Sequence, residues 1–166
     1  LGWRGTARQW RHFAAAYGFF AAFAAPLVLS VHSVVSWDFA MSNTAGWHST
    51  IFPPYFVAGA IYSGCGMVLT LLVPMTYLFK WHDYVNNWHF ENLAKMCLLT
   101  SGILTYAYAT EYFIAWYSQN PYEQAIFYWR ATGEYAWAFW LMIFCNCVAP
   151  LPFYIKSIRT NPVWLF

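Results

Sequence analysis

Residues Phe39 to Phe79 read FAMSNTAGWHSTIFPPYFVAGAIYSGCGMVLTLLVPMTYLF, a run of 41 residues without Asp, Glu, Lys or Arg. Just before it, the 26 residues between Arg11 and Asp38 carry none of these charges either. Both runs are long enough to cross a bilayer, which takes about 20 apolar residues in a helix. They indicate that lipid surrounds much of this chain.

The composition agrees with a membrane location. Hydrophobic residues make up 61% of the 166 residues and charged residues 8%, whereas soluble domains carry about 25% charged residues. A net charge of +2 is too small to indicate a nucleic-acid partner. We therefore expect an all-α integral membrane protein.

Four segments are apolar and long enough to cross the bilayer as helices. The third is the least apolar, because Lys95 near its start and Glu111 near its end leave only 15 uncharged residues between them. The sequence thus predicts a four-helix transmembrane bundle that forms one region over residues 1–166 and is part of a larger multi-helix subunit. The predicted helices cover residues 13–36, 54–79, 92–117 and 134–155.

The basic residues gather on one side of this predicted bundle. Seven of the eight flank the same ends of the helices, and only Arg130 falls on the other side. Cytoplasmic loops are enriched in Lys and Arg, so we expect a bacterial inner-membrane protein with both ends of this segment in the cytoplasm. The loops after the first and third helices would then lie at the outer face. The seven residues are Arg4, Arg8, Arg11, Lys80, Lys95, Lys156 and Arg159.

An ionisable side chain inside a membrane span is costly and usually serves a function. His32 lies inside the first predicted helix and Asp38 at its outer end. A histidine beside a carboxylate suits a substrate that loses two electrons and two protons. Because an ideal helix would place Asp38 about 240° around from His32, the two meet only if the helix ends near Ser36. The alternative is a histidine hydrogen-bonded to Ser36 or to a neighbouring helix, with Asp38 as a solvated acid in the loop.

Two further residues at the same predicted face are candidates. His48 belongs to the aromatic, proline-containing stretch from Gly46 to Phe56, which is expected to form an ordered lid. It either faces the same cavity as His32 or lies at the membrane interface. Glu111 is either a proton-relay acid or a structural acid that pairs with Arg130 or reaches the interface.

No metal or haem is expected to be bound by this chain. A bis-histidine haem needs two imidazoles at matched depth on facing helices, and His32 has no such partner in the sequence. Cys145 and Cys147 would lie about 200° apart on a helix and so would not bind one ion together. The cysteine and histidine spacings of iron-sulfur and zinc sites are also missing from the sequence.

Three short stretches carry a resemblance to a known family. They are SVHSVVSWDFA from Ser30 to Ala40, GWH from Gly46 to His48, and IFPPYFVAGAI from Ile51 to Ile61. With these stretches the chain resembles the polysulfide-reductase (NrfD-type) membrane family, in particular the large membrane subunit of bacterial alternative complex III. The second, homologous membrane subunit of that complex is a near relative. The family subunit has more helices than the four predicted here.

The resemblance implies a quinol:electron acceptor oxidoreductase complex. The membrane subunit would bind quinol, with menaquinone as the expected type, near the outer face and pass electrons to an iron-sulfur subunit on the periplasmic side. Multihaem cytochrome c subunits and other membrane subunits, one of them homologous, would complete the complex. The clusters and haems would belong to these partners, so the chain would not be catalytic alone. The resemblance implies that His32 and Asp38 belong to the quinol pocket. From their position near these two residues, we expect Trp37, Trp47 and Phe52 to form its walls and His48 to be a further candidate.

Two other functions remain open at this point. A proton-translocating subunit would need acids along the full depth of the membrane, whereas the centres of the first, second and fourth predicted helices are uncharged. A purely structural anchor of the same kind of complex would need no polar group at His32. A hydrophobic slot that opens from the lipid beside His32 would distinguish the quinol-binding interpretation from these two.

Overall fold

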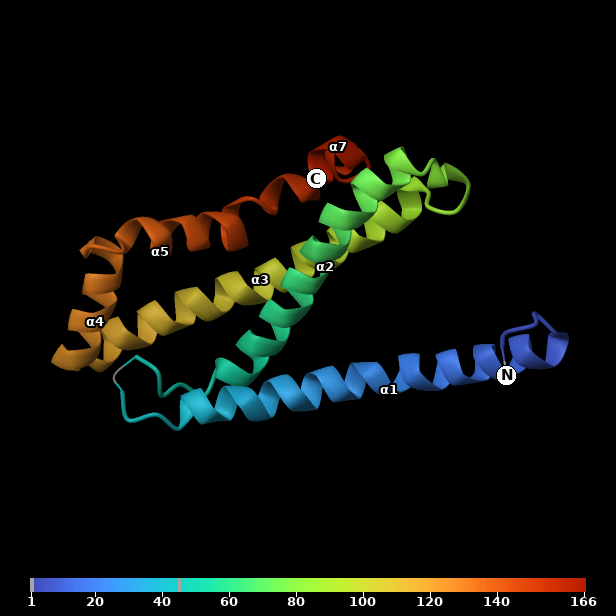
Figure 1. The fold of residues 1–166 in the computed structure, drawn as a ribbon. Helices are drawn as coiled ribbons and strands as arrows, with labels where there is room; N and C mark the ends of the chain where they lie inside the picture. The colour runs from blue at the N-terminus through green and yellow to red at the C-terminus, as the bar shows by residue number, and fades with distance from the viewer. Residues whose placement is uncertain (1, 45) are drawn as a thin grey trace.

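The computed structural model describes residues 2–44 and 46–166, and in that part of the chain every regular element is helical. Three long helices are followed by a series of shorter ones (Figure 1). The predicted all-α fold is thus confirmed. The elements are α1 (Ala7–Ala40), α2 (Phe52–Leu78), η1 (Trp81–Asp83), α3 (Asn87–Ser118), α4 (Pro121–Thr132), α5 (Ala136–Ile143), η2 (Phe144–Val148), η3 (Leu151–Tyr154), α6 (Lys156–Arg159) and α7 (Pro162–Leu165).

The long helices begin before the predicted starts, by two residues for α2 and by six and five residues for α1 and α3, which have side-chain caps. Thr6 caps α1 by accepting a hydrogen bond from the backbone N–H of Gln9, whose side chain bonds back to the Thr6 backbone. α2 has Pro53 and Pro54 in its first turn, where a missing N–H costs no helical hydrogen bond. The side chain of Asn86 caps α3.

The last predicted helix, residues 134–155, is not a single α-helix. α5 ends at Ile143 and passes into the π-helical turn η2, where the backbone N–H of Ala149 donates to the carbonyl of Phe144 at 2.8 Å. Pro150 follows and has no N–H to continue the pattern. The chain then continues as the short 3₁₀ helix η3.

This interruption leaves two carbonyl groups for side chains from other helices. The hydroxyl of Tyr62 on α2 donates to the carbonyl oxygen of Cys145 at 2.8 Å. The hydroxyl of Ser101 on α3 donates to the carbonyl oxygen of Asn146 at 2.6 Å. Since a carbonyl without a partner is costly in an apolar environment, these two bonds fasten the irregular segment to both long helices.

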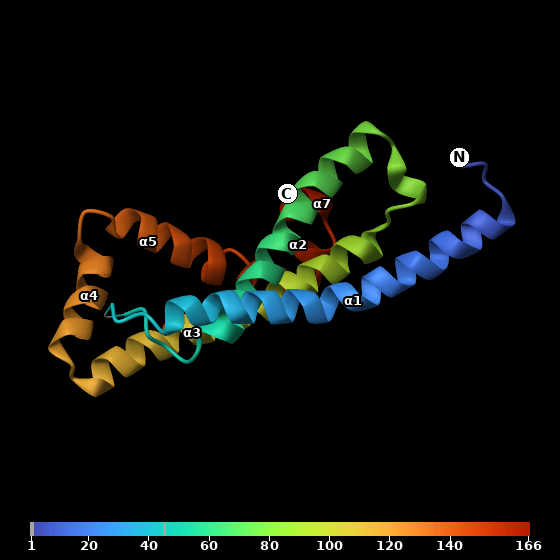
Figure 2. The ribbon, with the colours of Figure 1, turned by 60° about the horizontal axis from the view of Figure 1, so that its bottom comes forward.

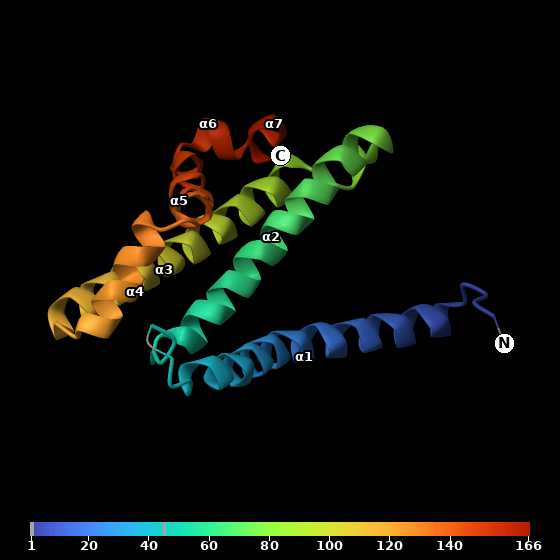
Figure 3. The ribbon, with the colours of Figure 1, turned by 60° about the vertical axis from the view of Figure 1, so that its left-hand side comes forward.

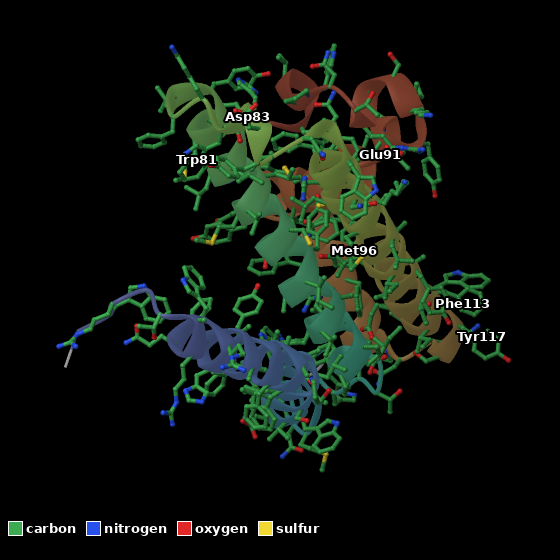
Figure 4. All side chains as sticks on the ribbon, turned by 90° about the vertical axis from the view of Figure 1, so that its right-hand side faces the viewer. Trp81, Asp83, Glu91, Met96, Phe113 and Tyr117 are labelled. Atoms are coloured by element: carbon green, nitrogen blue, oxygen red, sulfur yellow. The ribbon has the colours of Figure 1, made fainter. Side chains whose placement is uncertain are left out.

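The main apolar core lies at one end of the α2–α3 pair. α7 packs against this end (Figure 1), and at its surface the carboxylate of Glu91 binds Lys95 at 3.0 Å and Arg159 at 3.2 Å. In Figure 4, Glu91 lies at this end of α3, whereas Tyr117 lies at the opposite end. The buried core residues are Leu69, Val73, Phe90, Ala94, Cys97 and Leu165.

α1 is packed much less than α2 and α3. It meets α2 near the loop that joins them and diverges from it toward the N-terminus (Figures 1 and 3). None of the residues in its most apolar 18-residue window is buried. The view in Figure 2 shows the same loop beside α4, so the second half of the chain returns to the end at which α1 stops.

Three segments of the described residues are long and apolar enough to cross a membrane: α1, α2 and the stretch Ala136–Tyr154. They correspond to the first, second and fourth predicted helices. α3 is not among them, because its Lys95, Glu111 and many Thr and Tyr residues lower its hydropathy. The chain is therefore a membrane protein with three candidate spans, and the predicted number of four is not confirmed.

Candidate functional site

A cavity of about 580 Å³ lies at the end of the molecule where α1 stops. It is bounded by the loop before α2, the first turn of α2, the second half of α3, α4 and α5. Its walls are mainly aromatic, with Trp47, Phe52, Phe56, Phe127 and Phe139 among the lining residues. Ligand pockets of about 300–1,000 Å³ with apolar walls and a few polar groups are typical small-molecule sites.

The first cluster of polar side chains at the cavity is centred on two tyrosines, one from α2 and one from α3. The hydroxyls of Tyr55 and Tyr108 lie 3.0 Å apart, and the side-chain amide of Asn146 donates to the Tyr108 hydroxyl at 3.0 Å. Asn146 belongs to the π-helical turn η2. The irregular segment thus reaches the cavity through a hydrogen bond, and it fixes where the two phenol groups lie.

The second cluster of polar side chains contains the two charged residues of the lining, Glu111 on α3 and Arg130 on α4. The hydroxyl of Ser49, in the loop before α2, donates to the carboxylate of Glu111. Arg130 lies over the ring of Phe127, with its guanidinium carbon 5.2 Å from the ring centre. A carboxylate and a guanidinium cation therefore both border the same apolar space.

Tyr112 follows Glu111 in the sequence and also lines the cavity. Its hydroxyl is enclosed and has no hydrogen-bond partner among the described residues. Buried polar groups nearly always have a partner, and an exception calls for an explanation. The ring packs edge-to-face on Phe127, with 4.8 Å between the ring centres.

The loop that covers the cavity is attached to α3 and α4 by two adjacent residues. Next to Ser49, the ring of His48 places its Nε2 3.1 Å from Glu123 of α4 and its Nδ1 3.2 Å from the backbone carbonyl of Thr44. Gly46 has a positive φ of 77°, which favours glycine, and a Cβ there would lie 3.4 Å from Ile126 of α4. The loop therefore lies directly against α4.

The predicted site residues fall into two groups. Trp47 and Phe52 line the cavity, as expected for its walls, and His48 lies beside it in the covering loop. His32, Trp37 and Asp38 lie on α1 and are not part of the cavity lining. The Nδ1–H of His32 donates to the carbonyl of Val28 at 2.9 Å.

The structure does not bring His32 and Asp38 onto one face of the helix. α1 continues to Ala40, so the six-residue separation places the two side chains about 240° apart around the helix. Asp38 and Trp37 are exposed, and His32 is partly buried. Their roles at a quinol pocket stay predictions.

Sequence reasoning missed the contributions of Tyr55, Tyr108, Arg130 and Asn146, and it missed α4 as a helix. Part of the signal was present, because Tyr108, Glu111 and Tyr112 are spaced i, i+3 and i+4 and so share one helix face. The sequence indicated Arg130 as a possible partner of Glu111, whereas the structure places it in the cavity lining. Only a contact between distant segments could reveal that.

Among the described residues, no group of three or more His, Cys, Asp or Glu side chains is placed to hold a metal ion. The polar groups of the residues that line the cavity include phenols, a carboxylate and a guanidinium. Such groups suit an uncharged, flat organic molecule that exchanges protons and hydrogen bonds through oxygen atoms.

Two comparisons with known proteins complete this description. The search of curated proteins gives no match. The family described as polysulphide reductase, NrfD, matches residues 3–166, nearly the whole chain. The chain therefore belongs to the NrfD family, whose proteins are membrane subunits of quinone-interacting oxidoreductase complexes and typically partner with iron-sulfur subunits.

Proposed function

We propose that this chain is the quinol-binding part of a membrane subunit in a quinol:electron acceptor oxidoreductase of the bacterial inner membrane. The subunit oxidises quinol near the outer face, and electrons leave to an iron-sulfur protein on the periplasmic side. Multihaem cytochromes c and further membrane subunits, one of them homologous, complete the proposed complex, which is of the alternative complex III type. Menaquinone is the proposed quinone.

The observation that carries this proposal is the aromatic-walled cavity with phenol and carboxylate groups at its border. A quinol headgroup is flat and carries one oxygen at each end of the ring. The rings of Trp47, Phe52 and Phe56 offer stacking surfaces, while Tyr108 and Glu111 offer partners for the oxygens. A structural anchor needs neither the cavity nor these polar groups.

The position of the cavity along the chain supports an outer site. It lies beside the loop that follows α1 and beside α4, which follows α3. Arg130 is the only basic residue in the sequence of these two connections. The ends with seven basic residues lie away from it. The positive-inside rule then favours a cytoplasmic location for both ends of this segment and an outer location for the cavity.

α3 is proposed as the fourth span, although it is less apolar than the others. Its buried side includes Thr100, Ser101 and Ala107, which contact the rest of the protein rather than lipid. In membrane bundles such small and polar residues belong to helix interfaces. A helix that packs on one side against α2 and the last segment can therefore span the membrane without a fully apolar surface.

Two positions on the chain are proposed for the proton chemistry. The first is on α1, where His32 would accept or orient the proton of a quinol hydroxyl. Asp38 would take the proton onward or hold the imidazole tautomer, and Trp37 would form part of the wall. This surface of α1 is open in the described residues and would need another part of the subunit to close it. The cavity is the second position, and it contains Trp47 and Phe52.

A photoreactive quinone tests the proposal in the assembled complex. We expect light-dependent labelling of this chain at cavity residues such as Trp47 or Arg130, with competition by excess quinol. Labelling that is confined to other subunits would contradict the proposed function. His32→Phe, measured in the same complex, should lower quinol oxidation by about 10²- to 10⁴-fold if His32 is the general base, and near-normal turnover would exclude that role.

The proposed orientation has its own test. Thiol probes that do not cross the membrane should reach cysteines introduced into residues 42–50 from the outer side. Cysteines introduced into residues 80–86 should react only from the cytoplasmic side. The reversed pattern would overturn the orientation and place the cavity at the inner face.

A further inference from the structure

We propose, building on the function proposed above, that Glu111 accepts a proton from a quinol hydroxyl bound in the cavity and that Ser49 positions its carboxylate for this step. Oxidation of the quinol releases two protons and two electrons. The two electrons go to the iron-sulfur acceptor in the partner protein. One proton moves from the headgroup O–H to the Glu111 carboxylate, which releases it to the outer side and then accepts the second proton in the same way. The step therefore needs no redox group within this chain.

The first argument is location. Glu111 is a partly buried acid near the end of a long membrane helix, and it borders an apolar cavity instead of pointing to lipid or bulk water. A carboxylate in such surroundings is costly unless it has a partner or a function. It accepts a hydrogen bond from the neutral hydroxyl of Ser49, which leaves acceptor capacity on the carboxylate for a ligand.

The second argument is the set of groups around it. Arg130 places a positive charge on the same cavity, and such a charge favours the oxygen that becomes negative when a hydroxyl loses its proton. Tyr112 contributes to the cavity wall, while its hydroxyl is enclosed within the protein. Glu111 and Arg130 thus place a proton acceptor and a cation at the border of one space.

The third argument is a way out for the proton. The residue before Ser49 is His48, which binds Glu123 at 3.1 Å and is about half exposed. The imidazole of the covering loop and the carboxylate of Glu123 on α4 thus lie beside the residue that contacts Glu111. A proton that leaves Glu111 on this side reaches titratable groups at the water-exposed surface without crossing the apolar core.

The test compares variants of the assembled complex by two measurements, labelling with the photoreactive quinone and steady-state quinol oxidation across pH. Glu111→Gln keeps an oxygen that can accept from Ser49 but cannot take a proton. We expect its labelling to stay within about twofold of wild type while oxidation falls about 10²- to 10⁴-fold. Glu134→Gln is the matched control, because Glu134 is exposed and outside the cavity lining, and it should leave both measurements unchanged.

The pH profile separates a proton acceptor from a structural acid. If Glu111 must be ionised to work, oxidation in wild type declines on the acid side, and Glu111→Gln abolishes this decline. The other titratable groups on the cavity are Tyr55, Tyr108, Tyr112, Arg130 and Tyr135, with His48 and Glu123 beside it. If any of these groups is replaced by a residue that does not titrate, the decline in quinol oxidation at low pH should persist.

Ser49→Ala tests positioning. It should lower the oxidation rate by about tenfold without shifting the KM for quinol by more than about twofold, and Ser49→Thr, which keeps the hydroxyl, should restore the rate. If Glu111→Gln prevents assembly, Glu111→Asp provides the second measurement and should retain the acid limb at a reduced rate.

The outcomes distinguish this inference from the proposed function. Normal oxidation in Glu111→Gln with unchanged labelling would overturn the role of Glu111 while the cavity stays a quinol site. A flat pH profile in Glu111→Asp would overturn it as well. If wild type itself shows no labelling of the cavity, the proposed function fails first.

Discussion

The two ends of the α2–α3 pair are built from the same two helices and differ in how they are filled. At one end, aliphatic residues and Phe90 pack into a core, and the surface above it is closed by the Glu91 carboxylate with its two basic partners. At the other end, large aromatic residues surround a cavity of about 580 Å³. The α2–α3 pair is therefore closely packed at the end with the aliphatic core and contains a cavity at the end where polar side chains lie between the helices.

The difference follows from the residue types. Leu69, Val73 and Ala94 are compact enough for α2 and α3 to approach each other. Tyr55 and Tyr108 occupy the same interface at the hollow end, and their hydroxyls bond each other and Asn146. Because each ring is rigid and its hydroxyl needs a partner, the helices and α5 cannot collapse into the space between them.

The largest expected effect comes from matched truncations at the two ends. Phe90→Ala should lower the stability of the assembled subunit by about 3–5 kcal/mol, the usual loss for a buried Phe, because Phe90 is 2% exposed in the packed core. Phe127→Ala should cost less, because one side of this ring already faces the cavity. Thermal unfolding in detergent measures both, and equal losses would contradict the difference between the ends.

A smaller effect is expected from the bonds to the π-helical turn. Ser101→Ala and Tyr62→Phe each leave a carbonyl of that turn without its partner, which typically costs about 1–3 kcal/mol. Tyr106→Phe on the exposed side of α3 is the control. Ser101→Ala should also disturb the neighbouring Asn146 side chain and so weaken labelling by the photoreactive quinone. If thermal stability is unchanged in both Ser101→Ala and Tyr62→Phe, the π-helical turn keeps its shape without these two bonds.

The smallest effect is expected at the surface of the packed end. Arg159→Gln removes one partner of Glu91, and Lys95 remains as the other. We expect faster amide hydrogen exchange in α6 and little change in the rest of the chain, since exposed ion pairs contribute weakly. High salt should produce the same change in wild type, whereas exchange that spreads into α2 or α3 would show that this ion pair supports the core.

The general fold could be predicted because lipid imposes a simple rule on sequence. The uncharged runs around Pro26 and Gly64 required helices, and α1 and α2 follow them with ends only a few residues away. The third helix was harder, because Lys95 and Glu111 lie within it and only its neighbours explain them. The break in the last helix needed the combination of Pro150 and its partners on two other helices.

The candidate site could be predicted only in part for a related reason. Trp47 and Phe52 could be predicted as wall residues because they belong to an aromatic, proline-containing stretch between two predicted spans. Arg130 and Ser49 did not stand out, since their importance comes from contacts across the fold, such as the bond between Ser49 and Glu111, 62 positions apart. Helical periodicity describes neighbours within one helix and carries no information on such pairs.

The length of α1 has a consequence for its charged residues. A helix of 34 residues is about 51 Å long at 1.5 Å per residue, whereas the hydrocarbon layer is about 30 Å thick. If the helix stands upright, roughly 10 Å projects beyond the hydrocarbon at each end; a tilt shortens both projections. Arg8 near one end and Asp38 near the other then lie among the lipid headgroups. A proton that reaches Asp38 has already left the membrane interior, so the helix itself sets the depth at which that acid meets water.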